Sequence, residues 1–170
     1  LANYARHHGT GEPIRADLVE RIEASRLFGQ GFKTVEYLAA ALLDWAWHTI
    51  PAGAEPGDVF EFEAGALEDA GIDFPQIPPR YRTTYFAHIW RSGYAAGYYS
   101  YIWSEVLDAD TVQWFEESGG MTRANGERFR RGLLSRGNSV DPLEAFASVR
   151  GRAPRIDALL ARRGLDRAAD

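Results

Sequence analysis

The chain has 170 residues, of which 45% are hydrophobic and 25% charged, proportions typical of a folded globular protein rather than a disordered tail. Its formal net charge of −5 argues against nucleic acid as a partner, because a nucleic-acid binder usually carries a basic face. The absence of cysteine excludes disulfides, thiolate metal ligands and cysteine nucleophiles, and no apolar run is long enough to cross a membrane.

We expect no secretion signal, because Leu1-Ala-Asn-Tyr-Ala-Arg is too polar for an apolar leader. Together with the lack of cysteine, this favours a reducing compartment, and we expect a cytoplasmic protein without a membrane partner. The first residue is Leu rather than Met. We therefore expect the chain to be a piece of a longer protein.

Apolar residues that recur every three or four positions predict helices along most of the chain. In chain order, the predicted helices cover residues 15–26, 34–48, 59–70, 83–90, 94–117, 122–135, 142–149 and 155–163. The stretch 94–117 could form one helix or two, and the alternation Phe60-Glu-Phe-Glu also permits a strand at 59–70. Three prolines exclude a regular helix between residues 71 and 80.

Capping residues support these boundaries. Thr34 could cap the helix 34–48, whose apolar face leaves Asp44 elsewhere, and Asp141 followed by Pro142 is typical of a helix start. No stretch forms a clear strand ladder, and no linker divides the chain. We therefore predict an all-α fold, with a single domain over residues 1–170 built from about seven or eight helices.

Metal-ligating side chains are sparse. The chain has four histidines, His7, His8, His48 and His88, and no H-E-x-x-H pair. His7 and His8 are adjacent, so their side chains point in different directions. His48 ends an apolar helix, where a protonated imidazole interacts favourably with the helix C-terminus, and we favour this structural role. We expect no catalytic metal in this chain.

Aromatic residues gather within about twenty positions near the middle of the chain. The group comprises Tyr81, Tyr85, His88, Tyr94, Tyr98, Tyr99 and Tyr101, with Trp90 and Trp103 between them. Neutral hydroxyl and imidazole donors aimed at one point can stabilise an oxyanion. Tyr94, Tyr98 and Tyr101 would share one face of a helix, beside a hinge at Gly93. An aromatic core seam and an aromatic groove for an extended peptide are the alternatives.

The sequence FAHIWRSGYAAGYYSYIWSEV at 86–106 closely resembles the substrate-loop segment of the peptidyl-dipeptidases in the thimet-oligopeptidase family. Further stretches resemble the same family in the same order, namely NYARHHGTGEP at 3–13, QGFKTVEYLAAALLDWAWH at 30–48, TRANGERFR at 122–130, LSRGNS at 134–139 and RRGL at 162–165. The resemblance thus covers nearly the whole chain.

That family consists of mostly helical zinc peptidases with a deep channel, whose zinc is held by an H-E-x-x-H helix and a further glutamate. The resemblance implies that this chain follows those zinc-binding segments and lacks them, so that it supplies one wall of the channel. The longer enzyme would release C-terminal dipeptides from oligopeptide substrates. The chain alone would be inactive without the missing N-terminal portion, and surface meant for that portion could cause self-association.

The resemblance also implies roles for single residues. His88 would hydrogen-bond the bound peptide near the scissile bond, Tyr94 would contact the substrate and help to hold the oxyanion, and Tyr101 would stabilise the tetrahedral intermediate. Tyr98 would contact the substrate from the same face.

One departure from the family pattern lies before the first tyrosine, where Arg91-Ser92-Gly93 replaces three glycines. Loop closure would be stiffer, Gly93 would keep the remaining hinge, and Arg91 would add a charge near the peptide. The alternative to the peptidase is a non-catalytic helical peptide-binding module.

Overall fold

The computed structural model describes residues 4–166, so the ends of the predicted domain, 1–3 and 167–170, lie outside the described residues. Eight α-helices and two 3-10 helices occur in the described part. They are α1 (Ala16–Ser25), α2 (Gln30–His48), α3 (Val59–Asp69), η1 (Thr83–Tyr85), α4 (Ala87–Arg91), α5 (Ser100–Glu117), α6 (Arg123–Gly132), η2 (Leu134–Arg136), α7 (Pro142–Arg150) and α8 (Asp157–Arg163). The described range holds no strand beyond an isolated bridge between Arg6 and Pro13, and the all-α prediction is confirmed.

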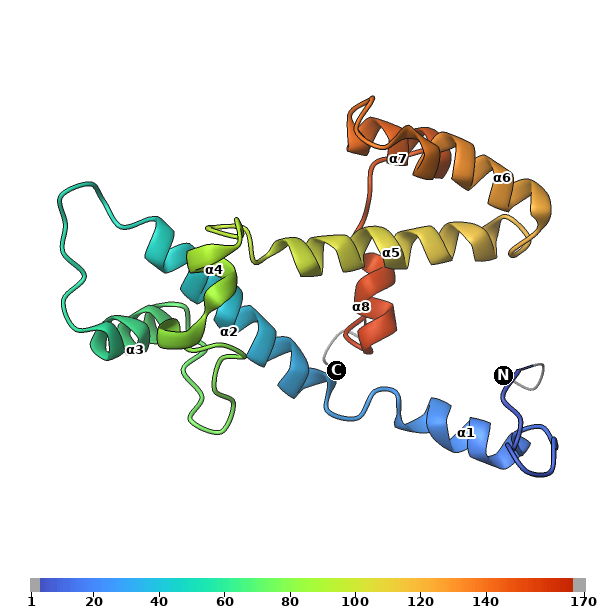
Figure 1. Cartoon of the computed structure of the whole chain (residues 1–170), viewed down its shortest axis with the longest axis horizontal. Coiled ribbons are helices and arrows are strands. Elements are labelled where there is room, and N and C mark those ends of the chain that lie inside the picture. Colours follow the sequence, from blue (N-terminus) through green and yellow to red (C-terminus); the bar gives the residue numbers. More distant parts are fainter. Residues whose placement is uncertain (1–3, 167–170) are drawn as a thin grey trace.

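The helices form an open arrangement around α5, which is the long central rod in Figure 1. α8 packs against α5, and the paired α6 and α7 fold back over the C-terminal half of α5, whereas α2, α3 and α4 gather near its start. α1 stands apart from the other helices, and none of its residues is buried. Within 4–166 no helix combines the length and apolar character that a bilayer span requires.

Apolar burial is divided between separate clusters rather than concentrated in one core. One cluster joins α2 to α4 and to the turns on either side of α4 through Ala40, Ala41, Phe86, Ile89 and Tyr98. Another joins α5 to α8 through Val106, Ala109 and Leu159. The accessible surface is 11905 Å², whereas a compact folded monomer of 19.0 kDa exposes about 8,400 Å². The chain therefore leaves much more surface uncovered than a self-contained globule of its size.

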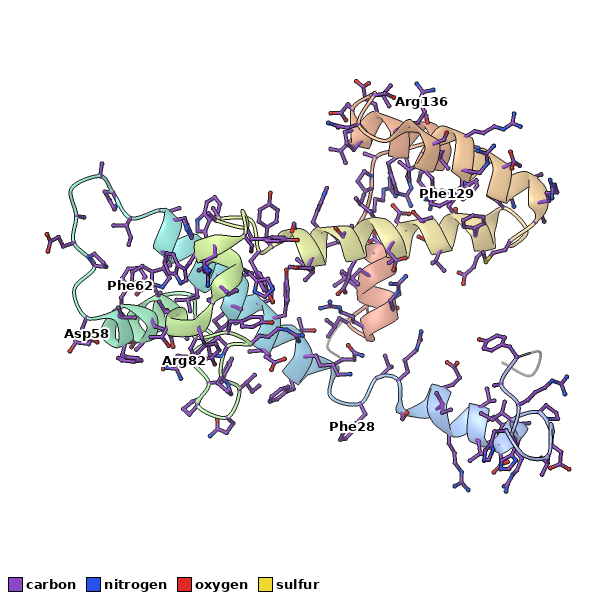
Figure 2. The ribbon with its side chains drawn as sticks, in the orientation of Figure 1. Phe28, Asp58, Phe62, Arg82, Phe129 and Arg136 are labelled. Atoms are coloured by element: carbon purple, nitrogen blue, oxygen red, sulfur yellow. The ribbon has the colours of Figure 1, made fainter. Side chains whose placement is uncertain are left out.

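Side-chain caps explain where several helices begin. Asp58 precedes α3 and accepts hydrogen bonds from the backbone nitrogens of Phe60 and Glu61, as Figure 2 places it at the helix start. A cap of this kind stabilises a helix by about 1 kcal/mol, which favours the helix over the strand alternative at 59–70. Asp141 and Pro142 open α7 as predicted.

Three predicted boundaries are wrong. α2 begins at Gln30 after Gly29, which has a φ of 71°, and the Thr34 hydroxyl accepts a hydrogen bond from Arg163 Nη1 at 3.0 Å instead of capping the helix. α5 begins at Ser100, so residues 94–99 form a turn instead of the first part of a helix. α6 ends at Gly132 rather than at residue 135, and a 3-10 turn follows.

Candidate functional site

Four predicted site residues lie in one cluster of ring contacts, which we call the tyrosine–histidine cluster: His88, Tyr94, Tyr98 and Tyr101. The ring centroids of His88 lie 6.1 Å from Tyr94 and 5.5 Å from Tyr98. Tyr101 in turn lies 5.5 Å from Tyr94 and 5.2 Å from Tyr98. The four rings therefore close a circuit, and the imidazole and the phenols share one wall of the molecule.

The cluster is assembled by a turn rather than by a helix face. His88 belongs to α4 and Tyr101 to the first turn of α5, whereas Tyr94 and Tyr98 lie in the turn between them. The backbone nitrogen of Tyr94 donates to the His88 carbonyl at 3.3 Å, which folds the chain back onto α4. The prediction that Tyr94, Tyr98 and Tyr101 share a helical face is wrong for the first two residues, although their convergence holds.

Tyr37 of α2 anchors this turn by stacking and by hydrogen bonds. Its ring stacks on Tyr98 with centroids 5.3 Å apart, and its hydroxyl donates to the Tyr98 carbonyl at 2.5 Å. The same hydroxyl accepts a hydrogen bond from the backbone nitrogen of Ile102 at 3.3 Å. Burial raises the pKa of Tyr37, so the phenol stays protonated and can donate in this way.

The hydroxyls of Tyr98 and Tyr101 have raised pKa values and are protonated donors at neutral pH. Burial raises the pKa of Tyr98 to about 12, and this side chain is only 3% exposed. A side-chain hydrogen bond with Tyr94 raises the pKa of Tyr101, which is 41% exposed. Tyr101 therefore presents a neutral phenol toward solvent, whereas Tyr98 serves mainly as the packed base of the cluster.

His88 is held by packing rather than by hydrogen bonds at its buried nitrogen. Nδ1 is buried, and the described residues offer it no hydrogen-bond partner. The ring instead packs on Tyr81, with centroids 4.8 Å apart, and on Phe86 at 6.0 Å. An unsatisfied buried nitrogen costs about 1–3 kcal/mol, so this imidazole occupies a position that stability alone does not favour.

Arg91 and Gly93, the other two predicted site residues, lie at the edge of the cluster. Arg91 is exposed at the last position of α4, outside the ring contacts. Gly93 is exposed and has a φ of 79°, a conformation that favours glycine. Between them, the Ser92 hydroxyl donates to the His88 carbonyl at 2.8 Å. This bond ties the loop to α4 at a position where the resemblance leads us to expect glycine.

Two residues that support the cluster were missed from the sequence, Tyr37 and Asp44. Asp44 was placed off the apolar face of its helix, and this is wrong, because Asp44 is 1% exposed. The two residues are seven positions apart on α2, so they lie on one face, the face that also carries the buried Ala40 and Ala41. Polar groups within an apolar stripe were the signal that could have found them.

His48, at the end of α2, contacts the last helical turn, as predicted. Its Nδ1 lies 2.8 Å from the carbonyl oxygen of Asp44 in the last helical turn and 2.9 Å from the Asp44 carboxylate.

A cavity of about 680 Å³ opens beside the cluster. Its lining comes from the C-terminal end of α1, from α2, α5 and α8, and from the loop before η1. The lining residues are Arg26, Gln30, Phe32, Lys33, Glu36, Tyr37, Arg80, Glu105, Arg162 and Arg163. Tyr37 lines this cavity and also stacks on Tyr98, so the cavity and the cluster share a wall. Five basic and two acidic side chains give the lining an excess of positive charge.

The described residues do not fit a zinc ion. Between residues 4 and 166, no group of three or more His, Asp or Glu side chains lies close enough together to hold a metal. The tyrosine–histidine cluster instead offers hydroxyl groups and an imidazole, which can donate hydrogen bonds.

Residues 4–166 thus form an all-helical structure in which the tyrosine–histidine cluster gathers hydrogen-bond donors and in which no group of metal ligands occurs. The sequence pattern of peptidase family M3 matches residues 1–165, and the chain belongs to that family. The resemblance inferred from the motifs is thereby confirmed.

Similar proteins include the dipeptidyl carboxypeptidase of Salmonella typhimurium, 50% identical over 164 residues, and that of Escherichia coli K12, 47% identical over 166 residues. These alignments cover 96% and 98% of this chain. Oligopeptidase A of Escherichia coli K12 is 33% identical over 165 residues, or 97% of the chain. The chain spans 24% of the length of each of these relatives.

Proposed function

We propose that the chain is the substrate-binding and transition-state-stabilising part of a cytoplasmic zinc metallopeptidase that releases C-terminal dipeptides from oligopeptides. The observation that carries the proposal is the closed circuit of His88, Tyr94, Tyr98 and Tyr101, which places several neutral donors on one wall. Two relatives named dipeptidyl carboxypeptidase support the choice of reaction. Zinc belongs to the N-terminal portion of the longer protein, and the chain alone is inactive.

Each donor has a distinct task in this proposal. Peptide hydrolysis passes through a tetrahedral intermediate whose former carbonyl oxygen carries negative charge, and preorganised donors stabilise that charge. The exposed Tyr101 hydroxyl and its neighbour Tyr94 donate to this oxygen. His88 donates to the backbone of the bound peptide, which orients the scissile bond.

The remaining predicted residues contact or admit the substrate. Tyr98 forms the floor under the reacting peptide, because it packs between His88 and Tyr101. Gly93 allows the loop to close, and Arg91 offers a positive charge at its rim.

The alternative is a helical peptide-binding module without catalysis. The exposed aromatic rings Tyr99, Tyr101 and Trp103 at the start of α5, together with the cavity and its positive lining, would suit an extended acidic peptide. The two functions differ in whether the wall acts on a bound peptide after the zinc-binding portion is supplied.

A chimera separates the two. Residues 1–165 replace the matching segment of the Salmonella typhimurium dipeptidyl carboxypeptidase, and dipeptide release from an oligopeptide is followed with and without a zinc chelator. The peptidase proposal predicts zinc-dependent release. A folded, zinc-loaded chimera that binds the peptide and releases nothing would favour the binding module.

Tyr101→Phe in the same chimera tests the central donor. We expect kcat to fall by about 10²–10³-fold with little change in KM, because the hydroxyl acts chiefly in the transition state. Tyr99→Phe is the matched control, since Tyr99 is a neighbouring exposed tyrosine outside the cluster, and its kcat should stay at the parental value. An unchanged kcat in Tyr101→Phe would remove this residue from the proposed role.

A further inference from the structure

Asp44 is a buried carboxylate whose hydrogen bonds leave its own helix and reach the turn that carries the tyrosines. It lies in the last third of α2 and is 1% exposed. Oδ1 accepts a hydrogen bond from the backbone nitrogen of Ala96, and Oδ2 accepts one from the backbone nitrogen of Tyr98, both at 2.9 Å. One side chain thus holds two alternate amides of the turn at the same time.

His48 supplies a further hydrogen bond to the Asp44 carboxylate. Its Nδ1 lies 2.9 Å from Asp44 Oδ1 and 2.8 Å from the carbonyl oxygen of the same residue. Both neighbours are acceptors, so Nδ1 carries a hydrogen and donates. The His48 side chain is one helical turn after Asp44 and is 21% exposed. The carboxylate therefore has three N–H donors, which fix its orientation toward the turn.

The turn needs such an anchor because its backbone is in an unfavourable conformation. Ala96 has a φ of 52°, the only non-glycine residue among those described with a positive φ. An L-residue adopts this left-handed region rarely and persists there only where its surroundings hold it. The next residue, Gly97, sits so close to Tyr94 that an added Cβ would lie 3.3 Å from the Tyr94 carbonyl oxygen. Tight, strained backbone therefore separates Tyr94 from Tyr98.

We propose that Asp44 is a positioning residue for the tyrosine–histidine cluster, with His48 as the residue that orients its carboxylate. The inference rests on the proposed function, because the cluster is what the anchored turn presents to a substrate. Holding Ala96 and Tyr98 fixes the Tyr98 ring, which contacts both His88 and Tyr101. Without the anchor the turn relaxes from its left-handed conformation, and the phenols and the imidazole lose their common orientation.

Asp44→Asn tests the anchor with an isosteric side chain. The amide keeps one acceptor oxygen and replaces the other with an NH2 group, so one of the two backbone N–H groups faces a donor. In the chimera we expect the amide hydrogens of Ala96 and Tyr98 to exchange about tenfold faster or more. We also expect kcat to fall by about 10- to 100-fold, because small displacements of catalytic groups have effects of this size.

Asp110→Asn is the matched control, because Asp110 is an equally buried carboxylate that contacts α7 and the segment before α8 instead of the turn. It should leave the exchange of the Ala96 and Tyr98 amide hydrogens and the kcat of the chimera unchanged.

His48→Leu is the second variant, which fills the space of the imidazole but removes one hydrogen-bond donor to Asp44. It should speed the exchange of the Ala96 and Tyr98 amide hydrogens and lower kcat, each by a smaller factor than Asp44→Asn does. Parental exchange and parental kcat in this variant would overturn the role of His48.

A double-mutant cycle shows whether Asp44 acts through the phenols. If it does, Asp44→Asn has little further effect on kcat in a Tyr94→Phe, Tyr101→Phe background. If Asp44→Asn lowers kcat by the same factor in the parental and the double phenylalanine backgrounds, Asp44 does not act through the phenols. If the exchange of the Ala96 and Tyr98 amide hydrogens is unchanged in Asp44→Asn, Asp44 does not anchor the turn. A parental kcat in the double phenylalanine variant would instead refute the proposed function, while faster exchange in Asp44→Asn would still support the anchor.

Discussion

Asp110 in α5 shows how one buried charge can join distant segments of an open molecule. The carboxylate is 0% exposed and accepts hydrogen bonds from Arg150 Nε at 2.7 Å, from Arg152 Nη1 at 2.6 Å and from the backbone nitrogen of Arg155 at 3.0 Å. Burial alone would raise the pKa of Asp110. The hydrogen bonds from Arg152 and Arg150 outweigh burial and lower the pKa below its ordinary value.

This network predicts an acid-sensitive free energy of unfolding. Because the pKa of Asp110 is lower in the folded chain than in the unfolded chain, the unfolded state binds its proton first as the pH falls. The stabilisation is fully present above a pH of about 4 and is lost as the pH falls through the lowered pKa. Urea unfolding between pH 7 and pH 2 should show this loss.

Urea unfolding of Asp110→Asn over the same pH range tests whether Asp110 causes the acid sensitivity. The substitution should lower the free energy of unfolding at pH 7 by about 3 kcal/mol, near the lower end for broken buried pairs, because Arg150 keeps its contacts with Glu117. It should also flatten the dependence on pH below 4. A variant with the parental pH dependence would show that Asp110 is not its source.

The packing of α6 on α7 predicts both the sign and the size of the change in stability when glycines of α6 are replaced. Gly132 ends α6 against α7, and a Cβ at this position would lie 2.5 Å from Val149 Cγ2. Gly126 lies within the same helix, and no atom outside its own helix lies within 4 Å of such a Cβ. The two glycines therefore differ in their surroundings although they belong to one helix.

Alanine at these two positions should have opposite effects on the midpoint of urea unfolding. Gly126→Ala should stabilise the chain by up to about 1 kcal/mol, because alanine favours the helix. Gly132→Ala should destabilise it by about 1–3 kcal/mol, because the stiff Val149 side chain cannot move aside without strain. Stabilisation by both substitutions would contradict the close packing of α6 on α7.

The helices were predictable where apolar periodicity and caps agree, as at Asp58 before α3 and Asp141 before α7. The turn at 94–99 was not, because its conformation depends on Asp44, which is more than fifty positions away in the sequence. The membership of the tyrosine–histidine cluster could be predicted from the aromatic motif. Its anchors on α2 could not, because spacing within the motif carries no information about a distant helix.

At the scale of the whole molecule, the uncovered surface is the main feature. Large apolar side chains are exposed on several elements, among them Phe28 at 87%, Met121 at 89% and Phe60 at 60%. Figure 2 shows Phe28 on the connection between α1 and α2, directed away from the other helices. Monomeric soluble proteins rarely expose so much apolar surface, and such surface is usually covered by a partner.

We therefore expect the isolated chain to self-associate. Sedimentation velocity should show a weight-average mass that rises with concentration above that of the 19.0 kDa monomer. Adding the N-terminal portion of the Salmonella typhimurium relative should replace self-association with a one-to-one complex. A chain that stays monomeric at all concentrations and does not bind that portion would contradict the proposal that the N-terminal portion covers this surface.

The central claim is that Tyr101 donates to the developing oxyanion, and a transition-state analogue tests it most directly. In the chimera, the inhibition constant of a peptide with a tetrahedral phosphinate in place of the scissile bond is compared between the parent, Tyr101→Phe and Tyr99→Phe. We predict that Tyr101→Phe weakens the analogue by the same factor by which it lowers kcat/KM, while Tyr99→Phe changes neither. An analogue that binds Tyr101→Phe as tightly as the parent, despite a lower kcat/KM, would contradict the account.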